Sequence, residues 1–324
     1  MIRHNDNALV VALDTSTDML ACAASWIDGQ TGETKLVSGD HMCRRHANVE
    51  LVNTVDGMLA QAGLDRSDVG CYVVGRGPGS FTGVRIGIST AKGLARGANA
   101  PLLDVSTLDA CAWTAWKAGV RGKLGILADA MRGEVYPALY MLVDEGPERQ
   151  FEREHVVKAP VALDEWRRAA DWDQVQLTGD GLVRYGKLLG EDETARCVER
   201  DLWWPSGEGL LLAHAAGDGD PARVLPIYTR LSDAEENERK RLGLAESAQS
   251  EITGVADELA GRHLQFRPMG AADAEGASAL EAACFEGAGH EAWTPGMFLS
   301  ELGEDVAAPR SWWVAHDDGK LLGL

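Results

Sequence analysis

The stretch Gly75-Arg76-Gly77-Pro78-Gly79-Ser80-Phe81-Thr82-Gly83-Val84-Arg85-Ile86-Gly87 separates a short apolar run from a run with helical spacing. Glycines in such a connection permit positive φ angles and close approach of two backbones, and Ser80 or Thr82 supplies a hydroxyl that caps the following helix. Helix N-termini entered by such loops often bind phosphate. Here no Gly-Lys-Ser/Thr follows and the spacing differs from the dinucleotide-binding fingerprint, so the sequence favours other roles.

The helix expected over residues 83–97 is rich in glycine. Gly83 and Gly87 are four residues apart, as are Gly93 and Gly97, so each pair leaves a bare patch on the helix surface. An interior glycine costs about 1 kcal/mol relative to alanine, so Gly87 and Gly93 together weaken this helix by about 2 kcal/mol. Close packing of another backbone offsets such a cost. That backbone belongs either to the protein's own sheet or to a helix of a partner, and the pattern is compatible with both.

The segments around this loop predict a layered α/β fold. Three strand-like runs come first in a meander, a helix with apolar residues at three- and four-residue spacing follows, and strands then alternate with helices. This order is typical of a mixed sheet covered by helices. The expected strands are residues 9–13, 21–27, 33–39, 71–74, 101–105, 124–128, 135–143 and 175–177, and the expected helices are residues 47–62, 83–97 and 108–118.

The composition changes after residue 231. Residues 232–262 are densely charged and contain few large apolar side chains, which indicates a solvated linker. Leu264 opens a new unit with strand, helix, helix and strand signals. The expected organisation is therefore a first domain over residues 1–231, with lobes of about 1–110 and 111–231, then the linker, then residues 263–324.

The bulk composition excludes several classes of protein. With 324 residues, 45% hydrophobic and 25% charged, and no apolar run of membrane-spanning length, the chain reads as soluble and globular. The polar start at residues 1–7 does not resemble a signal peptide, so we expect a cytoplasmic protein without membrane contact. Six cysteines without a C-x-x-C pair indicate reduced core residues. A net charge of −19 opposes independent RNA binding, so any work on RNA is expected to go through a partner.

Residues 77–87 resemble the signature of the TsaB family, whose members take part in making threonylcarbamoyladenosine next to the anticodon of tRNAs that read codons beginning with adenine. Supporting stretches are residues 13–17, 45–46, 105–108, 129–136 and 226–230. The resemblance covers about residues 9–231 and is strongest before Tyr140. It implies an actin- and Hsp70-like fold, with two lobes on a ribonuclease-H-like core.

The resemblance also implies partners. TsaB proteins pair with a catalytic paralogue, TsaD, through their first two long helices, and TsaE, an ATPase, joins them. Exposed apolar helix faces also favour a homodimer when the partner is absent, and tRNA is expected to be reached only through the complex. The interface residues expected on the two helices are His46, Leu51, Val55, Leu59, Gly83, Val84, Gly87, Thr90, Gly93 and Leu94.

The same resemblance argues against catalysis. TsaD carries a His-x-x-x-His pair that holds a metal just after the position of Val105, and Thr107 and Cys111 stand at those positions here. A threonine hydroxyl is a poor ligand for a catalytic divalent metal. His41 and His46 lie beside two arginines, whose positive charge disfavours cation binding. We therefore expect a non-catalytic subunit with no catalytic, cofactor-binding or metal-binding residue.

A rival interpretation rests on Asp14 and Asp129, each at the end of an expected strand. In such a fold, strand-end carboxylates bind Mg²⁺ for phosphoryl transfer. Against it, Thr15 and Ser16 make local turns with Asp14, and the sequence shows no further carboxylate cluster. Hydrolysis of ATP with Mg²⁺ by the chain alone would favour this rival, a metal-dependent phosphoryl-transfer enzyme.

Residues 264–269, 273–285, 293–295 and 312–315 resemble the start of the GNAT acetyltransferases, most of all RimI, which acetylates the N-terminal alanine of a ribosomal protein. The pyrophosphate-binding loop and the late catalytic tyrosine of that family would lie beyond Leu324. We therefore expect a partial GNAT α/β domain that neither binds acetyl-CoA nor acetylates a substrate. A partial domain is also expected to leave an unpaired strand edge, for instance at residues 311–315.

Overall fold

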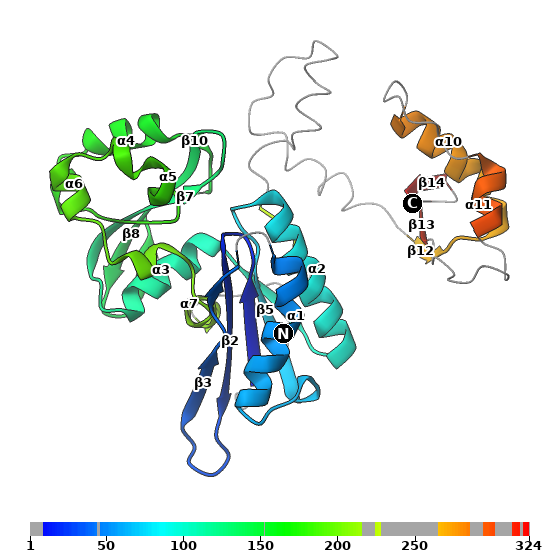
Figure 1. The fold of residues 1–324 in the computed structure, drawn as a ribbon, viewed down its shortest axis with the longest axis horizontal. Helices are drawn as coiled ribbons and strands as arrows, with labels where there is room; N and C mark the ends of the chain where they lie inside the picture. Colours follow the sequence, from blue (N-terminus) through cyan, green and yellow to red (C-terminus); the bar gives the residue numbers. More distant parts are fainter. Residues whose placement is uncertain are drawn as a thin grey trace. The chain divides into compact units, whose positions relative to one another are not determined.

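The computed structural model describes residues 9–43, 46–151, 153–215, 224–227, 265–285, 294–301, 313–317 and 320–323 (Figure 1). Two compact units make up the chain, Met1–Gln249 and Ser250–Leu324. The division falls inside the expected linker, residues 232–262, which lies outside the described residues. No described helix is long and apolar enough to cross a membrane.

The first lobe of unit Met1–Gln249 is built on a mixed sheet with the strand order β3-β2-β1-β5-β6 and with β4 beside β2. Strand β1 is antiparallel to β2 and parallel to β5, and β5 is parallel to β6. The early meander is therefore present, and the parallel strands follow it as expected. The elements are β1 (Leu9–Asp14), β2 (Met19–Ile27), β3 (Thr34–Ser38), β4 (His41–Met42), α1 (Ala47–Gln61), β5 (Val69–Gly75), α2 (Phe81–Ala98), β6 (Leu102–Val105) and α3 (Thr107–Lys117).

The second lobe has a sheet with the order β10-β8-β7-β11 and with β9 beside β8. The long β7–β8 hairpin is antiparallel, while β11 is parallel to β7. Its elements are β7 (Gly122–Asp129), β8 (Glu134–Val143), β9 (Gly146–Arg149), β10 (Val157–Lys158), α4 (Ala159–Arg167), β11 (Gln176–Thr178), α5 (Leu182–Tyr185) and α6 (Glu191–Ala195), and α7 (Gly207–Ala215) follows.

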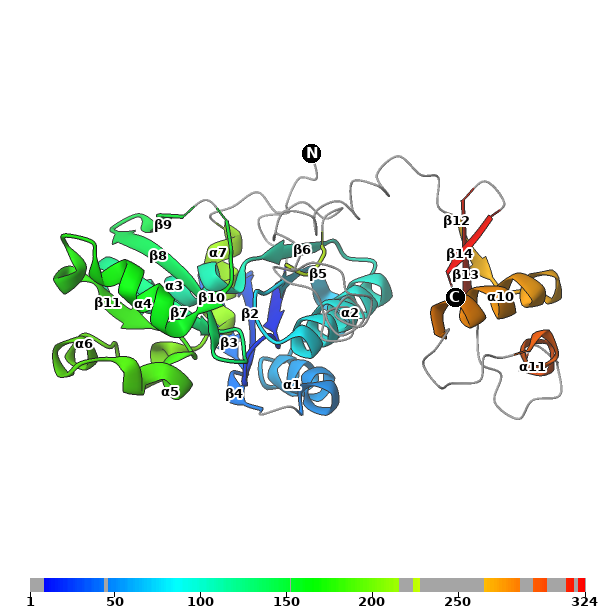
Figure 2. The same ribbon diagram turned by 90° about the horizontal axis from the view of Figure 1, so that it is seen from above.

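The two sheets and their helices form successive layers (Figure 2). Because side chains alternate along a strand, Leu13 and Val74 face α1 and α2, whereas Ala12 and Val73 face α7. In the second lobe, Leu124 and Ile126 pack against α3, while Leu127 faces α4 and α5. Helices α3 and α7 thus lie between the sheets, and α1 and α2 cover the opposite face of the first sheet.

Helix α7 returns to the first lobe, although the expected boundary assigned residues 111–231 to the second. Leu210 and Ala213 pack against Ala12, Ala21 and Val73 of the first sheet. The backbone N–H of Gly207 donates to Asp40 Oδ1 at 2.9 Å, which fixes the start of the helix to the first lobe. Helix α7 therefore joins the two lobes.

Unit Ser250–Leu324 contains β12 (Gln265–Pro268), α10 (Ala274–Phe285), α11 (Pro295–Glu301), β13 (Trp313–Asp317) and β14 (Lys320–Gly323). The strand, helix, helix and strand signals are all present, followed by a further strand. The expected open edge at residues 311–315 falls partly outside the described residues, which exclude 311 and 312. Strand β13 is the middle of an antiparallel sheet: Ala315 and His316 pair with both β12 and β14, so the expectation is wrong for Ala315, whereas Trp313 and Val314 pair with β12.

Candidate functional site

The glycine-rich loop packs around the turn that follows β1. The backbone N–H of Ser80 donates to the carbonyl oxygen of Ser16 at 2.7 Å, and the Thr15 hydroxyl donates to the carbonyl oxygen of Gly83 at 2.7 Å. A Cβ on Gly83 would overlap the backbone oxygen of Thr15, and one on Gly87 would lie 2.8 Å from Thr15 Oγ1. The first glycine pair therefore serves close packing inside the chain.

Helix α2 has defined ends. Ser80 is its N-cap, and the hydroxyl accepts the backbone N–H of Gly83 at 3.3 Å, as the sequence predicts. At the other end Asn99 adopts a left-handed conformation with φ of 51°, a conformation that asparagine tolerates better than most residues. The second glycine pair, Gly93 and Gly97, is exposed and has no neighbour within 4 Å of an added Cβ. Close packing within this chain therefore explains Gly83 and Gly87, but it does not explain Gly93 and Gly97.

The structure corrects the exposure expected for the interface residues. Leu51, Val55 and Leu59 of α1 are buried in the core beneath the helix, because the apolar stripe of α1 faces the sheet. Gly83, Val84 and Gly87 are buried on the inner side of α2. These six residues do not form an accessible surface. Of the other four, His46 and Gly93 are exposed, and Thr90 and Leu94 are half-buried.

The accessible side of the two helices carries a shallow hollow of ≈ 470 Å³. Val49 and Val52 of α1 are 64% and 38% exposed, and Phe81 of α2 is 40% exposed with the Arg85 guanidinium 3.8 Å from its ring centroid. We call this surface the α1–α2 face. It consists of these four residues together with Asn48, Thr82, Ile86, Ser89 and Thr90.

Thr107 and Cys111, expected at the metal-ligand positions of a catalytic relative, are both buried. The Thr107 hydroxyl donates to Asp14 Oδ2 at 2.5 Å, and its oxygen lies 3.1 Å from Ser16 Oγ. Burial raises the pKa of Asp14, and the hydrogen bonds from Thr107 and Ser16 oppose that shift. Burial also holds the pKa of the Cys111 thiol well above its ordinary value. The Thr107 side chain is therefore engaged in a hydrogen bond to the carboxyl group of Asp14.

The rival site at Asp14 and Asp129 has its carboxylate oxygens occupied. Asp14 Oδ1 accepts the backbone N–H of Ser16 at 2.6 Å. Asp129 Oδ1 accepts from the backbone N–H of Met131 at 2.9 Å, and its Oδ2 pairs with Arg184 Nε at 2.5 Å. A Mg²⁺ ion would have to displace these donors. Among the described residues, neither aspartate belongs to a group with metal-ligand spacing.

Asp180 lies next to Asp129 and was not singled out by the sequence. Its Oδ1 accepts the backbone N–H of Asp129 at 2.8 Å. Desolvation raises the pKa of Asp180 to about 7, and the negative charges of Asp129 and Asp18 add to the shift. A carboxyl group that titrates near neutral pH therefore lies at the ends of β7 and β11.

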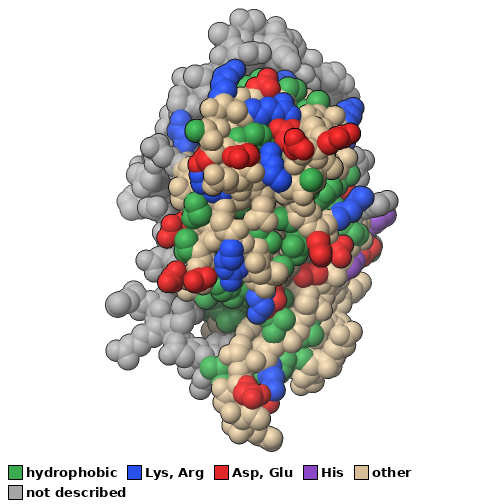
Figure 3. Space-filling model, turned by 90° about the vertical axis from the view of Figure 1, so that its left-hand side faces the viewer, with side chains coloured by type: hydrophobic (Ala, Val, Ile, Leu, Met, Phe, Trp, Pro, Cys, Tyr) green, Lys and Arg blue, Asp and Glu red, His purple; other side chains and the backbone are tan. Residues whose placement is uncertain are grey.

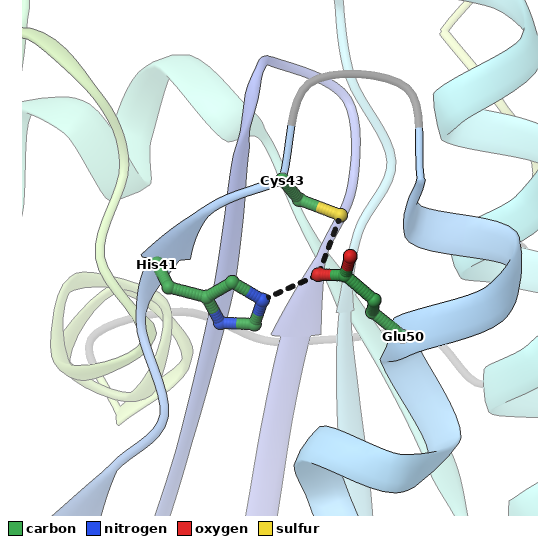
Figure 4. Close-up of side chains that lie close together, drawn as sticks. All are labelled: His41, Cys43 and Glu50. Atoms are coloured by element: carbon green, nitrogen blue, oxygen red, sulfur yellow. Dashed lines mark hydrogen bonds and ion pairs between the residues drawn. The ribbon is translucent and has the colours of Figure 1, made fainter.

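His41, Cys43 and Glu50 converge at the start of α1 (Figure 4). His41 Nε2 lies 2.8 Å and Cys43 Sγ lies 3.3 Å from the same oxygen, Oε2 of Glu50. His41 Nδ1 lies 2.9 Å from the carbonyl oxygen of Gly39. One potential ligand atom from each of the three residues lies within 4.8 Å of the others. We call this group the His41–Cys43–Glu50 cluster.

The hydrogen bonds of this cluster shift its pKa values. The bond to Gly39, followed by that to Glu50, raises the pKa of His41. The His41 and Cys43 donors lower the pKa of Glu50. Burial, with the Glu50 hydrogen bond, raises the pKa of the Cys43 thiol to about 11. Sequence reasoning weighed His41 only against His46 and missed the cluster.

The charged side chains show no large segregation on the face seen in Figure 3. Among the described residues visible there, Lys and Arg side chains alternate with Asp and Glu side chains. A continuous basic surface is what a protein uses to bind a nucleic acid backbone. This face therefore offers no basic track made of described residues, in line with the net charge of −19.

Comparison with known proteins gives a consistent result. The family described as "TsaD: tRNA N6-adenosine threonylcarbamoyltransferase" matches residues 41–162. The chain is 35% identical to the tRNA threonylcarbamoyladenosine biosynthesis protein TsaB of Escherichia coli over 204 residues, 62% of this chain and 84% of that protein. It is 36% identical to TsaB of Haemophilus influenzae over 130 residues, 40% of this chain and 52% of that protein. The structure of YeaZ from Pseudomonas aeruginosa superposes with a TM-score of 0.54 at 29% identity, covering 68% of this chain and 99% of that one.

Proposed function

We propose that this chain, which belongs to the TsaB family of tRNA threonylcarbamoyladenosine biosynthesis proteins, acts as a non-catalytic subunit in the formation of threonylcarbamoyladenosine in tRNA. The observation that supports the non-catalytic role is the Thr107–Asp14 hydrogen bond, because it engages the hydroxyl that stands where the sequence resemblance places a metal-binding histidine of the catalytic paralogue. Purified chain alone is expected to form no modified tRNA. With a threonylcarbamoyl donor present in every reaction, activity is expected only when the paralogue TsaD and the ATPase TsaE are added.

The proposed partner surface is the α1–α2 face. The match to the TsaD family over residues 41–162 includes both helices, which supports a paralogous pair built from similar elements. The face combines exposed apolar side chains, Val49, Val52 and Phe81, with polar side chains that line the hollow, among them Asn48, Arg85 and Ser89. Exposed aromatic and arginine side chains next to apolar ones are typical of protein interfaces. The buried residues Leu51, Val55 and Leu59 hold the face in place from beneath.

Replacing Val49 and Val52 together with glutamate is expected to weaken the complex with TsaD by at least about tenfold, because docking would bury unpaired carboxylates. Both side chains are exposed, so the fold should tolerate the change. The matched control is Val183→Glu, a 52% exposed valine on α5 of the second lobe. Calorimetric titration of TsaD into each variant measures the affinity. Equal affinities for the double variant and the control would contradict this surface.

Three further interactions are proposed. TsaE binds the assembled TsaB–TsaD pair. When TsaD is absent, the same α1–α2 face forms a homodimer. Light scattering of the Val49→Glu, Val52→Glu variant should then give a smaller mass than the parent chain at equal concentration. Contact with tRNA is proposed to be indirect, which the net charge of −19 supports. Such an assembly would act in the cytoplasm.

For unit Ser250–Leu324 we propose a relation to the opening part of the GNAT fold. Support comes from the order β12, α10, α11, β13, β14 and from the antiparallel sheet with β13 in the middle. These elements match the strand, helix, helix and strand signals that carry the resemblance. An experimental structure of the whole chain tests the proposal, and parallel pairing of β13 with either neighbour would contradict it.

A further inference from the structure

We propose that the His41–Cys43–Glu50 cluster is a zinc site with three protein ligands: His41 Nε2, Cys43 Sγ and a carboxylate oxygen of Glu50. The three atoms come from two separate elements. His41 and Cys43 are two residues apart along β4 and the segment after it, so extended backbone places them near each other, and Glu50 lies in the first turn of α1. The folded chain thus brings them together without any ion being needed to draw them in.

The distances fit a tetrahedral ion after small movements. Zinc bonds of about 2.0 Å to nitrogen and oxygen and about 2.3 Å to sulfur require about 3.3 Å between the nitrogen and the oxygen, and about 3.5 Å between the sulfur and the oxygen. The observed separations from Glu50 Oε2 are 2.8 Å for His41 Nε2 and 3.3 Å for Cys43 Sγ. The two distances from Glu50 Oε2 therefore have to change by about half an ångström or less. The third pair, His41 Nε2 and Cys43 Sγ, lies within 4.8 Å and needs about 3.5 Å around zinc.

The hydrogen bonds already orient the ligands. A backbone carbonyl only accepts, so His41 Nδ1 must carry the hydrogen that bonds to Gly39, which turns Nε2 toward the cluster. This is the outer-shell partner that zinc-binding histidines commonly have. When His41 is protonated on both ring nitrogens, Nε2 and the Cys43 thiol both donate to Glu50 Oε2. A Zn²⁺ ion bound to Nε2 and Sγ takes the place of the thiol proton, and of the Nε2 proton when His41 is charged, and the displaced protons are released to solvent.

The donor set selects the metal. A thiolate and an imidazole disfavour Mg²⁺ and Ca²⁺, which take oxygen ligands, and together with a carboxylate they suit Zn²⁺. The thiolate and the carboxylate also neutralise the charge of the ion, which offsets the positive charge of the arginines that follow Cys43 in the sequence. Cys43 is buried, while His41 and Glu50 are half-buried, so solvent can supply a fourth ligand from the open side. A bound ion would tie β4 to the first turn of α1.

Metal binding is tested on the full chain, purified without a histidine tag. After incubation with Zn²⁺ and removal of free metal, we expect about one retained zinc per chain by elemental analysis. Cys43→Ser, His41→Gln and Glu50→Gln should each weaken Zn²⁺ affinity by at least about tenfold, since even loss of an outer-shell partner has this effect. The matched controls are Cys197→Ser and His155→Gln, a half-buried cysteine and an exposed histidine outside the cluster.

Two further measurements test zinc binding at this cluster without relying on the number of zinc ions retained per chain. Cobalt(II) in place of zinc should give a sulfur-to-metal charge-transfer band that Cys43→Ser lacks and Cys197→Ser keeps. Zinc should also raise the thermal midpoint of the parent chain, because it binds only the folded state, and should raise that of Glu50→Gln by less at the same zinc concentration. Circular dichroism verifies that the variants fold. Failure of the parent to retain zinc, or equal retention by the cluster variants, would overturn the proposal.

Discussion

Replacing Gly83 with valine is expected to destabilise the chain by about 3 kcal/mol, the upper end of the usual cost of overpacking. A Cβ at this position overlaps the backbone oxygen of Thr15, so no flexible side chain can move aside to relieve the contact. To relieve the overlap, the backbones of Thr15 and Gly83 would have to move apart. That movement would also break the hydrogen bond from the Thr15 hydroxyl to the Gly83 carbonyl oxygen. Both effects act where the glycine-rich loop meets the turn after β1, at the centre of the first lobe.

Gly93→Val is the matched control on the same helix. An added Cβ at Gly93 meets nothing within 4 Å, so this variant should stay within about 0.5 kcal/mol of the parent. Urea denaturation followed by circular dichroism compares the two. Equal midpoints for Gly83→Val and Gly93→Val would show that Thr15 and Gly83 do not approach closely. Since Gly83 is buried, any loss of TsaD binding by Gly83→Val should accompany loss of folding and should vanish at low temperature if folding recovers.

The two glycine pairs of α2 show a limit of prediction from the sequence. Gly83 and Gly87 have the same four-residue spacing as Gly93 and Gly97, yet only the first pair packs closely against another segment. The partner of that contact, Thr15, is 68 residues away from Gly83. Spacing along a helix reports which residues share a side, but not which side meets the sheet.

The interface residues were misplaced for a related reason. The apolar stripe of α1 was assigned to a partner, but a helix on a sheet uses its main apolar stripe to cover that sheet. Leu51, Val55 and Leu59 therefore lie inside. The accessible apolar residues, Val49 and Val52, stand next to this stripe. A partner surface is therefore better predicted from apolar residues that lie outside the stripe facing the protein's own sheet.

The strands and helices of the first lobe were predictable because their periods of two and of three to four residues are clear. Helix α7 is different, because its segment Gly-Glu-Gly-Leu-Leu-Leu-Ala-His-Ala shows no amphipathic pattern, and its place between the lobes depends on tertiary contacts with Ala12 and Val73. The His41–Cys43–Glu50 cluster left one signal, a histidine and a cysteine two residues apart. Glu50 became relevant only once α1 was placed beside β4.

Replacing Asp180 with asparagine is expected to stabilise the chain above pH 7 and to change little near pH 4. The folded-state pKa of Asp180 is raised from 3.8 to about 7, chiefly by desolvation. The folded state thus binds a proton more tightly than the unfolded state, so stability is highest below the unfolded pKa and falls as the pH rises toward 7. Asparagine carries no charge, so the variant escapes this loss. Its carbonyl oxygen still accepts the backbone N–H of Asp129.

The shift of about three pKa units corresponds to an upper bound of about 4 kcal/mol at pH 8. Because the side chain is only half-buried, screening by water lowers this, and we expect about 2 kcal/mol. Urea denaturation of parent and variant at pH 4.5, 6 and 8 measures the difference, which should grow with pH and then level off. Asp173→Asn, an exposed carboxyl of the same lobe, serves as the control and should show no such trend. A difference that is constant across this range, or that shrinks as the pH rises, would mean that Asp180 ionises like an ordinary surface aspartate and that the ends of β7 and β11 are open to water.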